Sequence, residues 1–235
     1  MLEIAGLQGE YLRIRADESI LAETIEGLRD GDWDGLNVTM PLKAAAARLA
    51  DTLSVPAARS GSVNTLIRAG AGIAGDSTDC VAMQAIVGSE RFGSRTSVLL
   101  IGTGGSAAAA LVALGDEPNL YVTGRRPDAV EGLTAKLGGL PVAWGSAVAG
   151  ALVINATPLG MGGEVLPEGI LEVASGLADL PYGEVETPAI ARAATLGIPT
   201  ADGHEFLLRQ AMASFGLWTG VSIDMELLSG RLRNT

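Results

Sequence analysis

The sequence of 235 residues contains one cysteine and one histidine. One cysteine excludes an intrachain disulfide and fits a reducing compartment, so we expect a cytoplasmic protein. One histidine excludes a histidine-rich metal site, and we predict that the chain binds no metal. We interpret Cys80 as a small buried residue, since no histidine neighbours it in the sequence. His204 is interpreted as an exposed residue at the start of a helix rather than as a general acid.

Long apolar runs and an excess of basic residues are also lacking. The alanine-rich stretch of residues 106–114 is far too short to span a bilayer, and the opening MLEIAGLQGEYLRIR lacks the pattern of a signal peptide. The chain has 16 lysines and arginines against 27 acidic residues, which gives a net charge of −11. We therefore expect neither nucleic acid nor a membrane as a partner, although local basic residues can still bind a small anion.

The sequence is rich in glycine, with 32 residues, and in hydrophobic side chains, which make up 48% of it. This composition excludes a disordered protein and indicates many tight turns. Strand and helix patterns alternate, which predicts an α/β fold with a mainly parallel sheet. In the first part, strands are predicted at residues 11–15, 35–39, 62–67 and 72–75, and helices at residues 17–28, at 41–49 and from the N-cap residues 77–79 to 87.

The polar residues 89–95 are interpreted as a linker to a second unit. The elements predicted in it are strands at residues 97–101, 120–123, 142–144, 152–155 and 177–180, and helices at 106–114, 128–137 and 188–196. This is the order of a doubly wound dinucleotide-binding domain. Two further helices are predicted at residues 203–220 and 224–233.

A glycine-rich segment, Gly102-Thr103-Gly104-Gly105-Ser106-Ala107, lies between a predicted strand and a predicted helix. Glycine in such a turn lets backbone N–H groups approach a pyrophosphate, which the helix N-terminus stabilises. The spacing differs from GxGxxG, but the strand-to-helix junction followed by a second strand favours a dinucleotide site. An ordinary tight turn is the alternative.

The end of that second strand indicates which nicotinamide cofactor fits. An acidic residue there suits NAD, whereas positive charge suits the 2′-phosphate of NADP. The sequence reads Thr123-Gly124-Arg125-Arg126, with Asp128 close by. Because two guanidinium groups match the geometry of a phosphate, we predict NADP as the cofactor. A pair of solvated surface arginines is the alternative.

Lysine is scarce, since Lys136 is the only one besides Lys43. Lys43 is predicted in the first turn of a helix that Pro41 opens, where the helix dipole disfavours a cation and favours the neutral amine. Such an amine could exchange a proton with a hydroxyl or a ketone. Asp79, at the start of another helix, is the expected partner that orients it. On spacing alone, a surface lysine and an unrelated N-cap aspartate are an equal alternative.

An ordered set of motifs resembles the signatures of the shikimate dehydrogenase family. The resemblance covers about residues 10–220, and the set is highly specific although each motif alone is modest. The motifs are Asn37-Val38-Thr39-x-Pro41-x-Lys43, Gly61-Ser62-Val63-Asn64-Thr65, Gly75-Asp76-Ser77-Thr78-Asp79, the glycine-rich segment, Asn155-Ala156-Thr157-Pro158-Leu159-Gly160-Met161, Asp179-Leu180-Pro181-Tyr182, Glu186-Thr187-Pro188, and a helix from Gly203 through Gln210 to Gly220.

The resemblance implies a reversible, NADP-dependent reduction of 3-dehydroshikimate to shikimate, a cyclic hydroxy acid. Lys43 and Asp79 would form the catalytic pair. The substrate would contact Thr39, Asn64, Tyr182 and Gln210. The cofactor would contact Gly102, Thr103, Gly104, Gly105, Ser106, Ala107, Gly124, Arg125, Arg126, Thr157, Leu180 and Gly203.

The resemblance also implies an organisation into two domains. Residues 1–79 and 203–235 would form a smaller α/β substrate-binding domain. A Rossmann-type doubly wound parallel sheet, residues 80–202, would be inserted in it and bind NADP, with the active site in the cleft.

The sequence departs from the family pattern at its start. The family normally opens with a strand, a Ser-x-Ser-Pro loop and a helix entered through His-Asn, and none of these occurs here. The loop serines donate hydrogen bonds to the substrate carboxylate, a buried anion that needs them. The missing strand would leave a sheet edge to be covered or paired, as in a homodimer. Ser77 and Gly124 also stand where the family usually has asparagine.

Three functions are compatible with these observations. The first is the shikimate dehydrogenase reaction. The second keeps the dehydrogenase chemistry but changes the substrate, because the serine loop is missing. The third is a nucleotide-binding relative without turnover, against which the retention of Lys43, Asp79, Asn64 and Gln210 argues.

Overall fold

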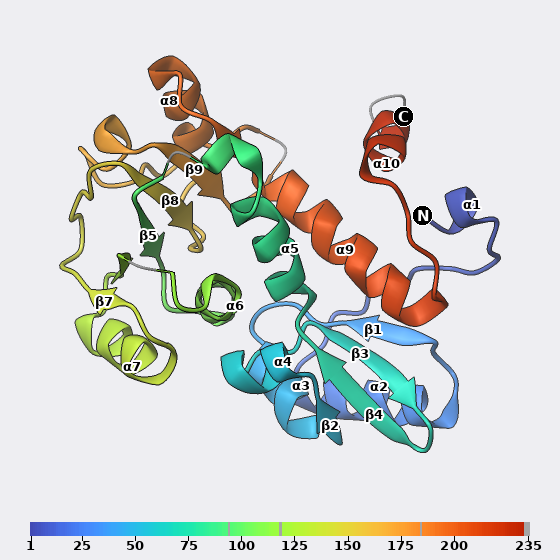
Figure 1. Cartoon of the computed structure of the whole chain (residues 1–235). Coiled ribbons are helices and arrows are strands. Elements are labelled where there is room, and N and C mark those ends of the chain that lie inside the picture. The colour runs from blue at the N-terminus through green and yellow to red at the C-terminus, as the bar shows by residue number, and fades with distance from the viewer. Residues whose placement is uncertain (94, 118, 184, 233–235) are drawn as a thin grey trace. The chain divides into compact units, whose positions relative to one another are not determined.

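The computed structural model describes residues 1–93, 95–117, 119–183 and 185–232, and the chain divides into two compact units (Figure 1). The first unit comprises Met1–Val81 and Leu208–Thr235, and the second comprises Ala82–Leu207. Both boundaries fall within helices, namely α5 (Thr78–Val87) and α9 (Gly203–Thr219). The roles predicted for the two parts, in binding substrate and NADP, stay predictions.

The first unit contains a four-stranded sheet in the order β1-β3-β4-β2. Its strands are β1 (Gly35–Asn37), β2 (Thr52–Leu53), β3 (Thr65–Ala69) and β4 (Gly72–Asp76). β3 pairs antiparallel with β1 and β4, whereas β2 pairs parallel with β4. The mainly parallel arrangement expected of the chain as a whole does not hold within this sheet, because β3 and β4 are joined by a tight hairpin, which only antiparallel strands allow.

Three helices pack around this sheet: α2 (Glu18–Asp30), α3 (Lys43–Leu49) and α4 (Val55–Ser60). α2 begins after Asp17, whose Oδ1 accepts a hydrogen bond from Ile20 N (3.0 Å), and its predicted apolar face is buried. The core they share contains Leu21, Ile25, Leu28, Val38, Ala45, Ala46, Ala57, Val63, Leu66 and Ile73. A smaller apolar cluster around Phe215 joins α9, α1 (Leu2–Ala5) and α10 (Met225–Leu232).

Two predictions for the first unit are wrong. Residues 11–15 form an irregular segment with an exposed Tyr11, because alternating side chains make a strand only where a neighbouring strand pairs with them. Pro41 does not open the helix, since α3 begins at Lys43 after a turn closed by a hydrogen bond from Leu42 N to Thr39 O (2.9 Å). Lys43 still lies in the first turn, as predicted.

The second unit contains a wholly parallel six-stranded sheet in the order β10-β9-β8-β5-β6-β7. Its strands are β5 (Ser97–Ile101), β6 (Leu120–Thr123), β7 (Leu140–Pro141), β8 (Ala151–Asn155), β9 (Gly176–Asp179) and β10 (Thr200–Ala201). The strand order reverses between β5 and β8, which is the topological switch point of a doubly wound fold. The predicted fold class is therefore confirmed.

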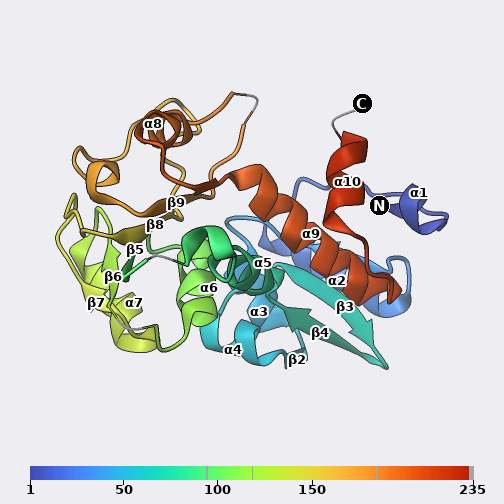
Figure 2. The same ribbon diagram turned by 45° about the horizontal axis from the view of Figure 1, so that its top comes forward.

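Successive residues of the central strands face opposite sides of this sheet. Val98 and Leu100 of β5 pack in a cluster with α6 (Gly105–Leu114) and α7 (Pro127–Leu137). Leu99 and Ile101 pack with α8 (Pro188–Leu196). This helix lies on the other face of the sheet (Figure 2). Because both faces are covered, β5 and β8 are buried throughout and have continuous apolar sequences.

One strand of the second unit was predicted at the wrong residues. The strand expected at 142–144 is β7, which lies two residues earlier. Gly138 (φ 90°) and Gly139 (φ 91°) turn the chain directly from α7 into the sheet. Pairing with β6 therefore starts at Leu140, opposite Tyr121.

The described part of the segment predicted as a polar linker, residues 89–93 and 95, is more than a simple linker. It contains a 3-10 helix, η1 (Glu90–Phe92), whose Phe92 is buried in the core of the second unit. A second 3-10 helix, η2 (Leu171–Val173), precedes β9.

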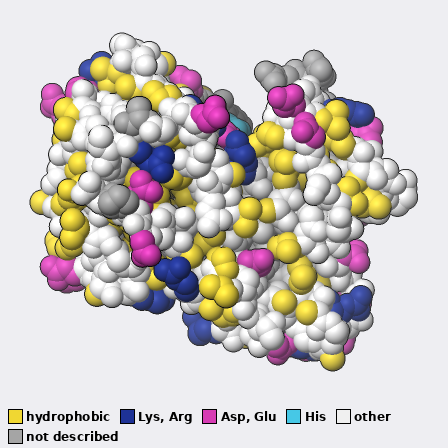
Figure 3. Space-filling view, in the orientation of Figure 1, with side chains coloured by type: hydrophobic (Ala, Val, Ile, Leu, Met, Phe, Trp, Pro, Cys, Tyr) yellow, Lys and Arg dark blue, Asp and Glu magenta, His cyan; other side chains and the backbone are white. Residues whose placement is uncertain are grey.

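Among the described residues, no helix combines the length and apolarity needed to cross a membrane. Acidic and basic side chains are interspersed on the face of the molecule shown in Figure 3.

Replacing Gly35 with alanine is expected to destabilise the first unit by about 3 kcal/mol. A Cβ at this position of β1 would overlap the indole of Trp218, whose Nε1 donates to Leu66 O (3.2 Å). Urea unfolding followed by tryptophan fluorescence measures the change. Gly230→Ala in α10 is the matched control, because its added Cβ meets no atom of the described residues within 4 Å. Equal stability of the two variants would contradict the prediction.

Candidate functional site

The lysine and aspartate singled out in the sequence form an ion pair in the first unit. Lys43 Nζ lies 2.6 Å from Asp79 Oδ2, although the residues are 36 positions apart. Lys43 is the first residue of α3, and Asp79 lies in the first turn of α5, where the helix dipole favours an anion. The side chain of Asp79 is 3% exposed and that of Lys43 is 18% exposed. The carboxylate is therefore enclosed, while the amine can be reached from outside.

Asn64, just before β3, holds the other carboxylate oxygen of Asp79. Its Nδ2 lies 2.9 Å from Asp79 Oδ1 and 3.2 Å from Gln210 Oε1. Its Oδ1 accepts a hydrogen bond from Thr78 N (2.8 Å), which fixes the orientation of the amide. The structure thus brings together four predicted site residues, Lys43, Asp79, Asn64 and Gln210.

A group of buried hydroxyls supports this cluster, and its role was not predicted from the sequence. Ser214 Oγ lies 2.8 Å from Thr65 Oγ1 and 3.1 Å from Thr78 Oγ1, and it accepts a hydrogen bond from Asn37 Nδ2 (2.9 Å). Asn64 Nδ2 donates to Thr78 Oγ1 (2.9 Å). The sequence did contain one signal for Ser214. It follows Gln210 by four residues and therefore lies on the same face of α9.

Two predicted substrate contacts take no part in these hydrogen bonds. Thr39 is exposed in the turn before α3. Tyr182, 44% exposed, belongs to the second unit, where its ring lies 6.2 Å from that of His204. His204 is exposed near the start of α9, as interpreted from the sequence. The contacts of Thr39 and Tyr182 with a substrate stay predictions.

The thiol of Cys80 is expected not to react with a thiol reagent such as DTNB at pH 8 while the protein is folded. Cys80 is 1% exposed and donates to Ser77 Oγ (3.3 Å), which confirms its interpretation as a small buried residue. Burial raises the pKa of this thiol to about 11, so little thiolate forms. Release of the reagent's chromophore should follow unfolding by urea. Rapid stoichiometric labelling of the native protein would contradict the prediction.

The glycine-rich turn of the second unit connects β5 to α6 at the switch point of the sheet. Gly102 has φ 127°, and a Cβ there would lie 2.8 Å from Ala156 O, so only glycine fits. Gly104 is the N-cap of α6 and makes no side-chain cap, and an added Cβ would meet no described atom within 4 Å. The N–H groups that begin α6 can therefore bind an anion.

The two arginines predicted to bind a 2′-phosphate follow β6. Arg125 and Arg126 are exposed, and Arg126 is the N-cap of α7. Gly124 before them is buried, and a Cβ there would lie 3.1 Å from Val130 Cγ2 and 3.2 Å from Thr103 Cγ2. A larger residue at this position would therefore require Val130 and Thr103 to shift.

The remaining predicted cofactor residues lie around the loops after β8 and β9. Thr157 follows β8, and its Oγ1 donates to Asn155 Oδ1 (2.6 Å). Leu180 follows β9 and is bonded through its N to Asn155 O (3.0 Å). A Cβ at Gly203 would overlap the carbonyl oxygens of Leu180 and Pro181, so the start of α9 needs glycine. The structure therefore brings Thr157, Leu180 and Gly203 to the carboxyl ends of adjacent strands.

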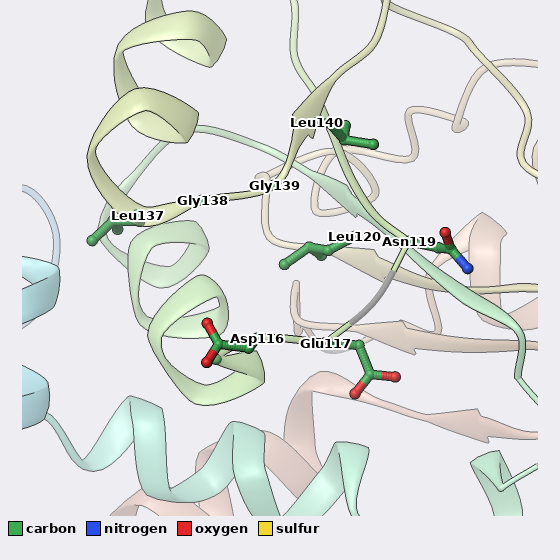
Figure 4. Close-up of a pocket in the computed structure, with 9 residues that line it drawn as sticks. Asp116, Glu117, Asn119, Leu120, Leu137, Gly138, Gly139 and Leu140 are labelled. Carbon is green, nitrogen blue, oxygen red and sulfur yellow. The ribbon is translucent and has the colours of Figure 1, made fainter.

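A hollow of about 250 Å³ in the second unit lies at the amino ends of β6 and β7 (Figure 4). It is lined where α6 leads into β6 and α7 leads into β7, by Gly115, Asp116, Glu117, Asn119, Leu120, Leu137, Gly138, Gly139 and Leu140. Ligands of doubly wound sheets bind at the carboxyl ends of the strands. This hollow is at the amino ends, so we do not assign it to the cofactor.

Comparison with known proteins gives one family. The profile of the shikimate dehydrogenase substrate binding domain matches residues 1–66. A shikimate dehydrogenase (NADP(+)) of Gluconobacter oxydans (strain 621H) is 31% identical over 246 residues, which cover 98% of this chain and 88% of the relative.

Solved structures agree with this result. Shikimate 5-dehydrogenase from Thermus thermophilus, in complex with NADP(H) and shikimate, has a TM-score of 0.86 at 28% identity and covers 95% of this chain and 87% of its own. The 5-ketofructose reductase of Gluconobacter sp. strain CHM43 has a TM-score of 0.84 at 26% identity, over 99% of this chain and 90% of its own. Since a curated relative matches almost the whole sequence, the chain belongs to the shikimate dehydrogenase family.

Proposed function

We propose that this chain catalyses the reversible NADP-dependent reduction of 3-dehydroshikimate to shikimate. The observation that carries the proposal is the Lys43–Asp79 ion pair, held by Asn64 beside Gln210. Membership of the family supports it, as does the solved T. thermophilus relative in complex with NADP(H) and shikimate. A nucleotide-binding protein without turnover would have no evident use for this buried arrangement.

In the proposed reaction, Lys43 and Asp79 manage the proton. During reduction the ammonium of Lys43 donates a proton to the ketone oxygen, and during oxidation the neutral amine accepts the hydroxyl proton. Asp79 orients the amine and balances the charge of its ammonium form, against the unfavourable dipole of α3. The cofactor NADPH, when bound, supplies the hydride.

The polar side chains around the ion pair would hold the substrate. A cyclic polyol presents hydroxyl groups that both donate and accept, and the carboxamides of Asn64 and Gln210 can satisfy both. Thr39 and Tyr182 are proposed as further contacts on the basis of the family motifs. A site built to bind hydroxyls rejects analogues that lack them, because its polar groups would be left unpaired.

The second unit fits NADP at three places. The glycine-rich turn Gly102–Ala107 would hold the pyrophosphate, since Gly104 leaves open space above the N-terminus of α6. Arg125 and Arg126 would bind the 2′-phosphate. Thr157, Leu180 and Gly203 would line the nicotinamide half.

The reaction can be tested by identifying its product. The protein is incubated with 3-dehydroshikimate and NADPH, and the product is analysed by mass spectrometry and NMR. We expect shikimate, formed in equal amount to the NADPH consumed. Incubations with 3-dehydroquinate and 5-ketofructose test the alternative of a changed substrate. Faster turnover of either than of 3-dehydroshikimate would refute the proposal.

A further inference from the structure

Asp179 is a fully buried carboxylic acid that the proposed reaction does not use. It ends β9, directly opposite Asn155 at the end of β8. Its Oδ1 accepts a hydrogen bond from Asn155 Nδ2 (2.7 Å), and its Oδ2 accepts one from Thr187 Oγ1. Burial raises the pKa of Asp179, and the two donors oppose this shift. A buried carboxyl group is costly unless it is hydrogen-bonded, and here each of its oxygens has a donor.

Oδ1 of Asp179, which accepts the hydrogen bond from Asn155, helps to fix the conformation of the loop after β8. Asn155 Nδ2 also donates to Leu159 O (3.0 Å), and its Oδ1 accepts from Thr157 N (3.2 Å) and Thr157 Oγ1 (2.6 Å). Thr157 Oγ1 in turn accepts from Leu159 N (3.1 Å). The conformation of residues 155–159 therefore depends on the orientation of one amide, which Asp179 fixes.

The other oxygen of Asp179 controls the segment after β9. Thr187 caps α8, because its Oγ1 accepts a hydrogen bond from Ile190 N (3.3 Å) while donating to Asp179. Thr187 also packs closely against the loop after β8, since a Cβ at Gly160 in this loop would lie 3.1 Å from Thr187 Cβ. Asp179 thus ties the loop after β8 to the start of α8.

We propose that Asp179 is a positioning residue that locks together the loops forming the nicotinamide half of the NADP site. This inference rests on the proposed function, because Thr157 and Leu180 are assigned to that half only by the family motifs. A carboxylate suits the task, since it accepts from two donors and offers no proton of its own. Asparagine would present an N–H group to one of the two donors, and an apolar residue would leave both without an acceptor.

The test compares two ligands that share the adenosine 2′-phosphate group. NADP⁺ has the nicotinamide half, and adenosine 2′,5′-bisphosphate lacks it. For Asp179→Asn we expect the Kd of NADP⁺, measured by calorimetry, to rise about tenfold, while that of the bisphosphate changes less than about twofold. In steady-state assays, kcat should fall while the KM for shikimate is little changed. An unchanged NADP⁺ affinity, or equal losses for both ligands, would overturn the proposal.

A pair of variants at Thr187 repeats the test without altering the acid. Thr187→Val removes the hydroxyl at almost constant volume and should reproduce the selective loss for NADP⁺. Thr187→Ser keeps the hydroxyl and should bind NADP⁺ like the unaltered protein. A serine variant as weak as the valine variant would show that packing matters rather than the hydrogen bond. If the unaltered protein bound neither ligand, the proposed function itself would fail, which separates the two results.

Discussion

Replacing Lys43 with alanine is expected to lower kcat for shikimate oxidation about 10³-fold. The substitution removes the group that accepts the hydroxyl proton and leaves Asp79, 3% exposed, without its cation. Binding of NADP⁺ involves other residues in the proposal, so its Kd should change less than about threefold. Initial rates of NADPH formation at saturating substrates give kcat, and calorimetric titration gives the Kd of NADP⁺.

Lys136→Ala provides the matched control, because it removes the other lysine from an exposed position in α7. This variant should retain full activity. Lys43→Arg keeps the charge near Asp79 but cannot serve as a proton acceptor, so it should be almost as inactive as the alanine variant. A Lys43→Ala variant with more than about a tenth of the normal kcat would exclude Lys43 as the proton-transfer group.

Replacing Arg125 and Arg126 together with alanine is expected to weaken NADP⁺ binding about 100-fold. The physical reason is the loss of charge-assisted hydrogen bonds to the 2′-phosphate, which are stronger than neutral ones. NAD⁺ has a hydroxyl in place of that phosphate, so its weaker binding should change little. Calorimetric titration of both cofactors at one fixed ionic strength gives the comparison.

Arg192→Ala is the control for this experiment, because it removes an exposed guanidinium that pairs with Glu172 (2.9 Å) and lies in no predicted cofactor motif. It should affect neither cofactor. Equal losses for NADP⁺ and NAD⁺ in the double variant would show that the arginines do not distinguish the 2′-phosphate.

The elements predicted best from sequence are marked either by their burial pattern or by residues that cap them. β5 and β6 have the predicted bounds, and β5, which is covered on both faces, has the largely apolar sequence typical of such a strand. α8 also has its predicted bounds, set by the Thr187 N-cap and by Gly197 at the C-terminus. Residues 11–15 show the limit, since their alternation resembles a strand but does not specify a pairing partner.

The candidate site, like the fold, could be predicted from the sequence only in part. Lys43 and Asp79 were expected to pair because both have side chains whose chemistry is specific and both begin a helix. Ser214 and Asp179 were not assigned roles, because their functions depend on hydrogen bonds to neutral partners distant in sequence. Serine and aspartate are too common in ordinary turns and caps for such a role to be visible in the sequence.

The most direct test of the central claim is the initial rate of NADPH formation from shikimate and NADP⁺, followed by its near-ultraviolet absorbance, with NAD⁺ and quinate in parallel. We expect a sustained rate that depends on shikimate, is much higher with NADP⁺ than with NAD⁺, and exceeds the rate with quinate. Tight NADP⁺ binding without turnover of shikimate would contradict the proposed reaction.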